Sequence, residues 1–145
     1  MFTMKKAGNV AQNPLGAVRG LLPTDTLSRL HEMPRAELDA LPVGVIQVDD
    51  AGVILQFNRV EGDMTGFRAE DVEGKNLFFE LAPCMNNGLV YGKFRAGVDA
   101  GSLDHEVLYA LTYRMRPVLT QIRLWRDPAT ATNWVLLGRV GSVVK

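Results

Sequence analysis

Apolar and β-branched residues gather in five short segments of the chain, separated by polar and turn-forming residues, and this pattern predicts a β-sheet. The expected strands are residues 43–48, 53–57, 106–115, 118–125 and 134–140. Asp49-Asp50-Ala51-Gly52 lies between the first two and has the residue types that tight hairpin turns require. Two early strands and three late strands therefore flank a middle section that lacks the strand pattern.

The middle section has the spacing of helices. Asn58 followed by Glu61 fits a capping box, in which each side chain accepts from the other residue's backbone N–H. A longer helix is expected over 89–100, because apolar residues recur there every four positions and Gly101 can end it. Strands segregated from helices predict an α+β domain, with a five-stranded antiparallel sheet and helices on one face.

The first 40 residues precede this pattern and are expected to form an arm and a helical cap. Residues 1–23 are rich in glycine, asparagine and proline and have weak periodicity. Thr24 is expected to cap a short helix, which Pro34 ends before a second helix begins. The expected organisation is an N-terminal arm and cap over 1–40 and one sheet domain over 41–145.

Length, charge and cysteine content limit the classes of function. The 145 residues are enough for one domain with one core. The formal net charge is zero, so attraction to nucleic acid or to an anionic membrane is not indicated. No apolar run reaches the ~18 residues of a membrane span. A single cysteine excludes an internal disulfide and favours a reducing, cytoplasmic location.

The last third of the chain is basic. Residues 111–145 carry six basic side chains and one acidic side chain. Four of the basic residues lie in or beside the late strands: Arg114, Arg116, Arg123 and Arg126. They predict either a docking surface for an acidic partner or a solvated face that the acidic middle of the chain offsets.

Cys84 is the candidate for covalent chemistry. It follows Ala82-Pro83 at the end of an apolar stretch. Taken alone, it is either an inert core residue or a nucleophile placed for a reaction. No metal site is expected, because His31 and His105 have no ligand spacing with it.

Several short segments together resemble the photoactive yellow protein family of PAS sensor domains. Asn58 with Thr65-Gly66-Phe67 resembles the general PAS signature, and the more specific segments follow the family's order over about residues 36–140. These segments are Gly52–Asn58, Glu61–Gly66, Gly74–Asn76, Ala82–Cys84, Tyr91–Phe94 and Thr112–Pro117. Glu-Gly-Asp at 61–63 and Ala-Pro-Cys at 82–84 are together the specific part of the match.

The resemblance implies a single PAS photosensory domain that acts as a blue-light receptor and signalling module, not as an enzyme. It implies p-coumaric acid as the cofactor, held by Cys84 as a thioester. Glu61 would be the buried acid that donates a proton to the pigment, and Thr65 the outer hydroxyl of that network. Tyr113 and Met115 would line the pocket. Isomerisation and proton transfer would then rearrange the N-terminal segment.

Two positions depart from the family's pattern. Phe57 stands where the family usually has a tyrosine that hydrogen-bonds the pigment. Phe67 stands near the family's covering arginine, and Arg68 follows one residue later. Because phenylalanine cannot donate a hydrogen bond, Phe57 predicts a raised pKa for the pigment's phenol and a longer-wavelength or mixed absorption band.

Each assignment has an alternative from the residues alone. Glu61 can complete the capping box, Thr65 can be an ordinary helix-end hydroxyl, and Tyr113 and Met115 can be core residues. The alternative function is a PAS interaction module without the pigment, which senses redox state or a small ligand through Cys84 or only dimerises. In either case, the expected partner is an unidentified signalling protein or a second copy of the chain.

Overall fold

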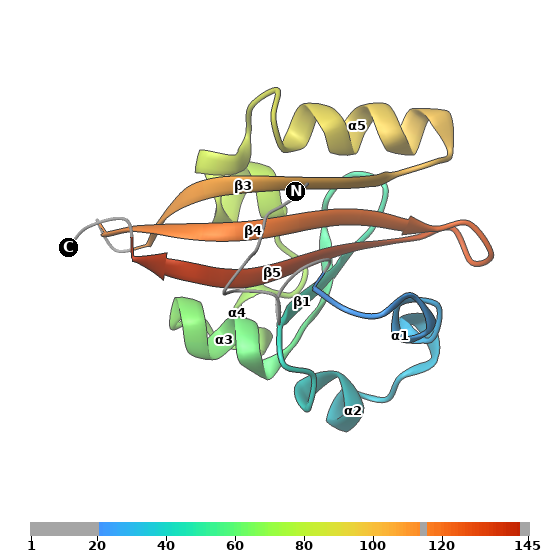
Figure 1. The fold of residues 1–145 in the computed structure, drawn as a ribbon, viewed down its shortest axis with the longest axis horizontal. Helices are drawn as coiled ribbons and strands as arrows, with labels where there is room; N and C mark the ends of the chain where they lie inside the picture. Colours follow the sequence, from blue (N-terminus) through green and yellow to red (C-terminus); the bar gives the residue numbers. More distant parts are fainter. Residues whose placement is uncertain (1–20, 114–115, 143–145) are drawn as a thin grey trace, which may run out of the picture.

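The sheet has five antiparallel strands in the order β2-β1-β5-β4-β3, which confirms the predicted α+β class. The computed structural model describes residues 21–113 and 116–142. The strands are β1 Gly44–Val48, β2 Ile54–Phe57, β3 Asp104–Tyr113, β4 Arg116–Asp127 and β5 Thr132–Ser142. β1 pairs with β5, so the early and late strands form one sheet with the helices attached around it (Figure 1).

The late strands extend beyond the apolar segments that predict them. β4 and β5 pair continuously down to Asp127 and Thr132, whereas the pattern places the start of the last strand at Trp134. At the hairpin, the carbonyl of Asp127 accepts from Ala131 N at 2.8 Å. Main-chain hydrogen bonds hold these positions without any need for buried side chains, so the apolar pattern underestimates the strand length.

The middle section contains five short helical elements. They are α3 Arg59–Thr65, α4 Ala69–Val72, the π-helical turn η3 Leu77–Leu81, the 3-10 turn η4 Pro83–Met85 and α5 Tyr91–Ala100. α5 begins two residues later than predicted, because Asn87 Oδ1 accepts from the N–H groups of Leu89 and Val90 before the helix starts. Gly101 ends α5 in the left-handed conformation, with φ 74°, as expected.

The two faces of the sheet carry separate apolar cores. Ile46, Val135 and Leu137 face the core that α3, η3 and α5 cover. Their strand neighbours, including Val45 and Leu136, point to the opposite face, because side chains alternate along a strand. The helices of the middle section therefore lie on one face of the sheet, as predicted, and the N-terminal cap covers part of the other face.

The cap consists of α1 Thr24–Leu27, η2 Leu30–Glu32 and α2 Arg35–Asp39. The expectation that Thr24 caps the first helix is wrong: Thr24 is the first helical residue, and no side-chain hydrogen bond caps this end. Leu27, Leu30 and Leu38 are almost completely buried against the sheet. This packing compensates for helices that are too short to be stable alone.

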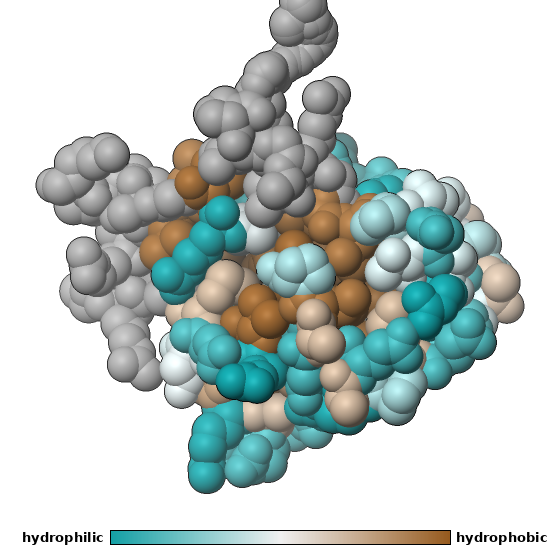
Figure 2. Space-filling view, turned by 60° about the horizontal axis from the view of Figure 1, so that its bottom comes forward, coloured by the Kyte–Doolittle hydropathy of each residue, from teal (hydrophilic) through white to brown (hydrophobic). Residues whose placement is uncertain are grey.

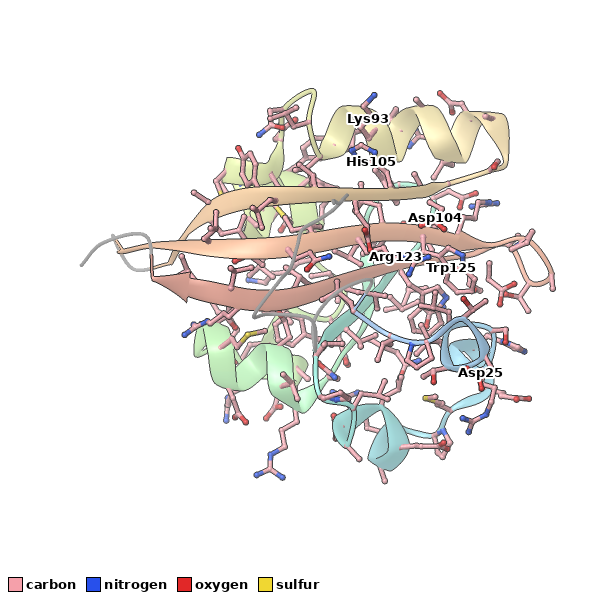
Figure 3. The ribbon with its side chains drawn as sticks, in the orientation of Figure 1. Asp25, Lys93, Asp104, His105, Arg123 and Trp125 are labelled. Carbon is pink, nitrogen blue, oxygen red and sulfur yellow. The ribbon has the colours of Figure 1, made fainter. Side chains whose placement is uncertain are left out.

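Ion pairs neutralise much of the basic character expected for the late strands. Arg123 on β4 donates to both carboxylate oxygens of Asp104 on the neighbouring β3, at 2.9 and 2.8 Å (Figure 3). Arg126 pairs with Asp50 at 2.8 Å. Arg114 lies outside the described residues, and the side chain of Arg116 is not described. The described arginines of this group therefore fit the interpretation as a charge-balanced face.

Apolar residues gather in the centre of the face shown in Figure 2, and polar residues surround them. This view turns the cap side of Figure 1 toward the reader. None of the helices in the described ranges is long and apolar enough to cross a membrane.

Candidate functional site

A cavity of about 200 Å³ lies between the sheet and the middle helices. Most of its wall is apolar, with side chains from β1, β5, η3 and η4, and three polar side chains reach it. The lining residues are Ile46, Glu61, Thr65, Phe67, Leu77, Leu81, Ala82, Pro83, Cys84, Met85 and Leu137. The cavity brings together Cys84 and Glu61, the two residues that the sequence singles out for chemistry.

Glu61 does not complete the capping box. Asn58 Oδ1 accepts from Glu61 N at 3.1 Å, which is the expected half of the motif. The N–H of Asn58 instead donates to the carbonyl of Val45 at 3.0 Å, so the Glu61 carboxyl is released from that role. Glu61 is buried, and its Oε1 has no hydrogen-bond partner within the described part of the chain. A buried carboxyl oxygen without a partner is costly and marks a place where a ligand can complete the network.

A glycine makes room for this carboxyl. Gly44 on β1 lies directly against Glu61 Oε1, and a Cβ at position 44 would overlap that oxygen. Sequence periodicity does not identify Gly44 as a functional position, since it only marks the start of a strand. The contact exists because α3 crosses β1, which no local pattern reveals.

Burial raises the pKa of Glu61 to about 8, because the charged form loses its hydration. The positive charge of Arg139 opposes this effect and lowers the pKa. At neutral pH, Glu61 is therefore mostly a neutral acid that can donate a proton. A general proton donor inside an apolar pocket requires this ionisation behaviour.

Cys84 lies in the 3-10 turn η4, directly after the π-helical turn, and its side chain is half-buried. Its carbonyl accepts two hydrogen bonds, from Tyr109 Oη at 2.9 Å and from Asn87 Nδ2 at 2.9 Å. Tyr109 comes from β3, and Asn87 precedes α5, so three segments meet at the cysteine backbone. Local sequence patterns do not identify Tyr109 as a site residue, because it reaches Cys84 from 25 residues away, and the role of Asn87 depends on the conformation of the turn.

The Tyr109 hydroxyl makes two hydrogen bonds, because it donates to the Cys84 carbonyl and accepts from Asn87 Nδ2 at 2.6 Å. Replacing Tyr109 with phenylalanine is expected to lower the free energy of unfolding by about 1–3 kcal/mol, the net contribution of two such bonds. The aromatic ring is kept, so its packing should not change. Urea unfolding of Y109F measures the effect. Y91F is the comparison variant: the Tyr91 ring packs against Phe78 and Phe79, and its hydroxyl interacts with Arg95. An unchanged free energy of unfolding in Y109F would contradict a structural role for the Tyr109 hydroxyl.

Thr65 and Phe67 occupy the end of α3. The Thr65 hydroxyl donates to the carbonyl of Glu61 at 2.9 Å and accepts from Phe67 N at 3.2 Å. This hydroxyl therefore connects the backbone of Glu61 to the backbone of Phe67, just beyond the end of α3. Phe67 is 42% exposed and lines the cavity from its outer side. That Phe67 stands in for a covering arginine stays a prediction.

The other predicted site residues are Phe57, Tyr113 and Met115, and none of them is placed on the cavity wall within the described residues. Phe57 is 1% exposed and belongs to the core, and it is not among the lining residues. Tyr113 is the last residue of β3, but its side chain is not described. Met115 lies outside the described residues. The proposed contacts of Phe57, Tyr113 and Met115 with a pigment stay predictions.

Comparisons with known proteins agree with this architecture. Residues 32–128 match the PAS fold family. The photoactive yellow protein of Rhodothalassium salexigens is 35% identical over 116 residues, which are 80% of this chain and 93% of the relative. The photoactive yellow protein of Halochromatium salexigens is 31% identical with the same coverage.

A solved structure with the same fold has higher sequence identity. It is the photoactive yellow protein domain of the sensor histidine kinase Ppr from Rhodospirillum centenum, which is 40% identical with a TM-score of 0.73. The match covers 76% of this chain and 96% of that domain. The cavity described above therefore lies in a scaffold similar to that of a light-sensing domain.

Proposed function

The chain belongs to the photoactive yellow proteins within the PAS superfamily, and from this premise we propose that it is a blue-light receptor with p-coumaric acid attached to Cys84 as a thioester. The relatives named photoactive yellow protein support a photoreceptor role for the family. The observation that carries the proposal is that Cys84 and Glu61, whose Oε1 has no partner among the described residues, line the same cavity.

The cavity fits one aromatic ring with a short chain. In another protein, a cavity of roughly 150 Å³ is enough to bind benzene. The cavity here is about 200 Å³ and has a thiol-bearing residue and a neutral acid on its wall. Glu61 Oε1 lacks a partner among the described residues, and a phenolic oxygen is a suitable acceptor for the proton of this carboxyl.

Attachment would form a bond between the Cys84 sulfur and the acyl carbon of an activated p-coumaroyl ester. The bond from that carbon to the ester's leaving group breaks, and the leaving group takes up the thiol proton. The wall around Cys84 contains Leu81, Ala82 and Met85, which keep water away from the product. Tyr109 and Asn87 hold the cysteine backbone in place during and after attachment.

When bound, the pigment supplies a phenolate oxygen and a double bond that light isomerises. Glu61 holds a proton beside that oxygen in the dark and is the residue that can release it. The carboxylate left behind is buried, and an unpaired buried charge costs several kcal/mol. This cost is large against the ~5–15 kcal/mol that stabilises a typical domain.

The N-terminal cap is directly connected to the helix that carries Glu61. Asn58, which caps α3, donates to the carbonyls of Leu38 and Val43 at 2.9 and 3.0 Å. Asp39 of the cap accepts from Arg59 N at 2.7 Å. A shift of α3 that relieves the charge on Glu61 would break these bonds first. We therefore expect the cap to be the part of the protein that rearranges.

Mixing the purified protein with an activated p-coumaric ester tests the proposal. The expected result is a yellow product with one p-coumaroyl mass added at Cys84, identified by peptide mass spectrometry. C84A should gain neither colour nor mass. A parent protein that stays colourless while its thiol remains titratable would overturn the proposal and favour a PAS module without pigment.

A further inference from the structure

Arg139 connects β5 to the end of the helix that carries Glu61. Its guanidinium Nη2 donates to the carbonyl of Met64 at 2.6 Å. Met64 lies in the last turn of α3, three residues after Glu61. Arg139 is exposed to solvent, so the cation covers the outer side of this turn while the Glu61 carboxyl occupies the inner side.

The surroundings of Glu61 contain few other charges in the described part of the protein. β1 presents Gly44, which has no side chain. On α3 itself, Arg59 and Asp63 are exposed and pair with each other at 3.8 Å. Cys84 faces the carboxyl from across the cavity. Arg139 is the group whose charge acts on the Glu61 carboxyl against the effect of burial.

We propose that Arg139 is a positioning residue that serves as the counter-charge of the Glu61 carboxylate, held over the end of α3 by its hydrogen bond to the Met64 carbonyl. It stabilises the ionised form of Glu61 from outside the cavity without touching a ligand. A guanidinium has five N–H donors, so the bond to Met64 leaves others free to orient toward a newly formed charge.

The consequence for signalling rests on the proposed function, in which Glu61 releases its proton after illumination. Arg139 would then reduce the cost of the buried carboxylate and prolong the state in which Glu61 is ionised. The ionisation itself needs no pigment, because the carboxyl is present in the protein alone. The inference can therefore be tested separately from pigment attachment.

The test is an infrared pH titration of the pigment-free full-length protein. The C=O stretching band of the protonated Glu61 carboxyl is assigned by its absence in E61Q, and the midpoint of its loss is followed as pH rises. In R139Q the midpoint should shift upward, because the ionised form loses its counter-charge. R139K keeps the charge and should remain close to the parent. R59Q removes a positive charge from the solvent side of α3 and is the matched control.

Raising the ionic strength of the parent protein gives a second readout that needs no variant. Salt screens an exposed guanidinium, so the Glu61 midpoint should rise with added salt. A midpoint that is insensitive to both R139Q and salt would overturn the inference, as would equal shifts in R139Q and R59Q. Neither result bears on whether Cys84 accepts the pigment, and failed attachment would not alter the titration.

Discussion

The free energy of unfolding of the parent protein is expected to fall by about 5 kcal/mol between pH 4.5 and 8, and this fall should be absent in the E61Q variant. The pKa of Glu61 is raised to about 8 in the fold, from an ordinary value of 4.5. Below pH 4.5 the carboxyl is protonated in both the folded and the unfolded chain. Between the two values, only the unfolded chain releases the proton, so the parent becomes less stable as pH rises. Glutamine does not ionise, which removes this contribution.

Urea unfolding of pigment-free protein at a series of pH values from 4.5 to 8 measures this gradient. The control is E70Q, since Glu70 is exposed on α4 and its replacement should leave the gradient unchanged. The difference between parent and E61Q isolates the contribution of Glu61 from that of every other titrating group. If the free energy of unfolding changed with pH equally in the parent and in E61Q, the Glu61 carboxyl would have to be hydrated or paired in solution.

Replacing Phe57 with tyrosine is expected to lower the pKa of the bound pigment's phenol by about one to two units. A hydrogen bond to a charged acceptor contributes ~1.5–3 kcal/mol, and the parent residue cannot supply it. The parent should therefore show a mixed or longer-wavelength band near neutral pH. F57Y should show one narrower band at shorter wavelength, because the added donor localises the negative charge on the phenolic oxygen.

Absorbance spectra of pigment-loaded protein across a pH series test this expectation. F57L is the matched control, because leucine is apolar and also lacks a donor, so its titration should resemble that of the parent. Phe57 belongs to the same apolar core as Ile46, Leu77, Met85 and Leu137, which line the cavity, and a tyrosine hydroxyl would extend beyond the ring. An identical titration of F57Y and parent would mean that this hydroxyl does not reach the pigment.

The sequence was sufficient for the parts of the protein that depend on local periodicity. The apolar, β-branched segments 43–48 and 53–57, separated by turn residues, located β1 and β2 within one residue. Asn58 signalled the start of α3, and Gly101 the end of α5, since both act on backbone groups of their own helix. The segments around Glu61 and Cys84 were enough to identify the family, which the comparisons confirm.

The hydrogen bonding and protonation of the Glu61 carboxyl could be determined only from the tertiary structure. The capping-box pattern assigns its carboxyl to the backbone of Asn58, but that N–H bonds to Val45 on the neighbouring strand. The space beside Gly44 and the charge of Arg139 also come from strands distant in sequence. A local pattern can place this residue on a helix, but the protonation of its carboxyl depends on surroundings that only folding assembles.

The same division applies to the cap and to Cys84. The sequence predicts short helices that form a cap before residue 41, but the structure shows that Leu27, Leu30 and Leu38 belong to a second core on the far face of the sheet. Tyr109 reaches Cys84 only because β3 folds back beside η4. The sequence by itself therefore determined the strands and two helix ends, which depend on local backbone pattern, and the family, which depends on short motifs. The tertiary structure decided the cavity, the proton on Glu61 and the hold on Cys84, because these depend on atoms brought together across the chain.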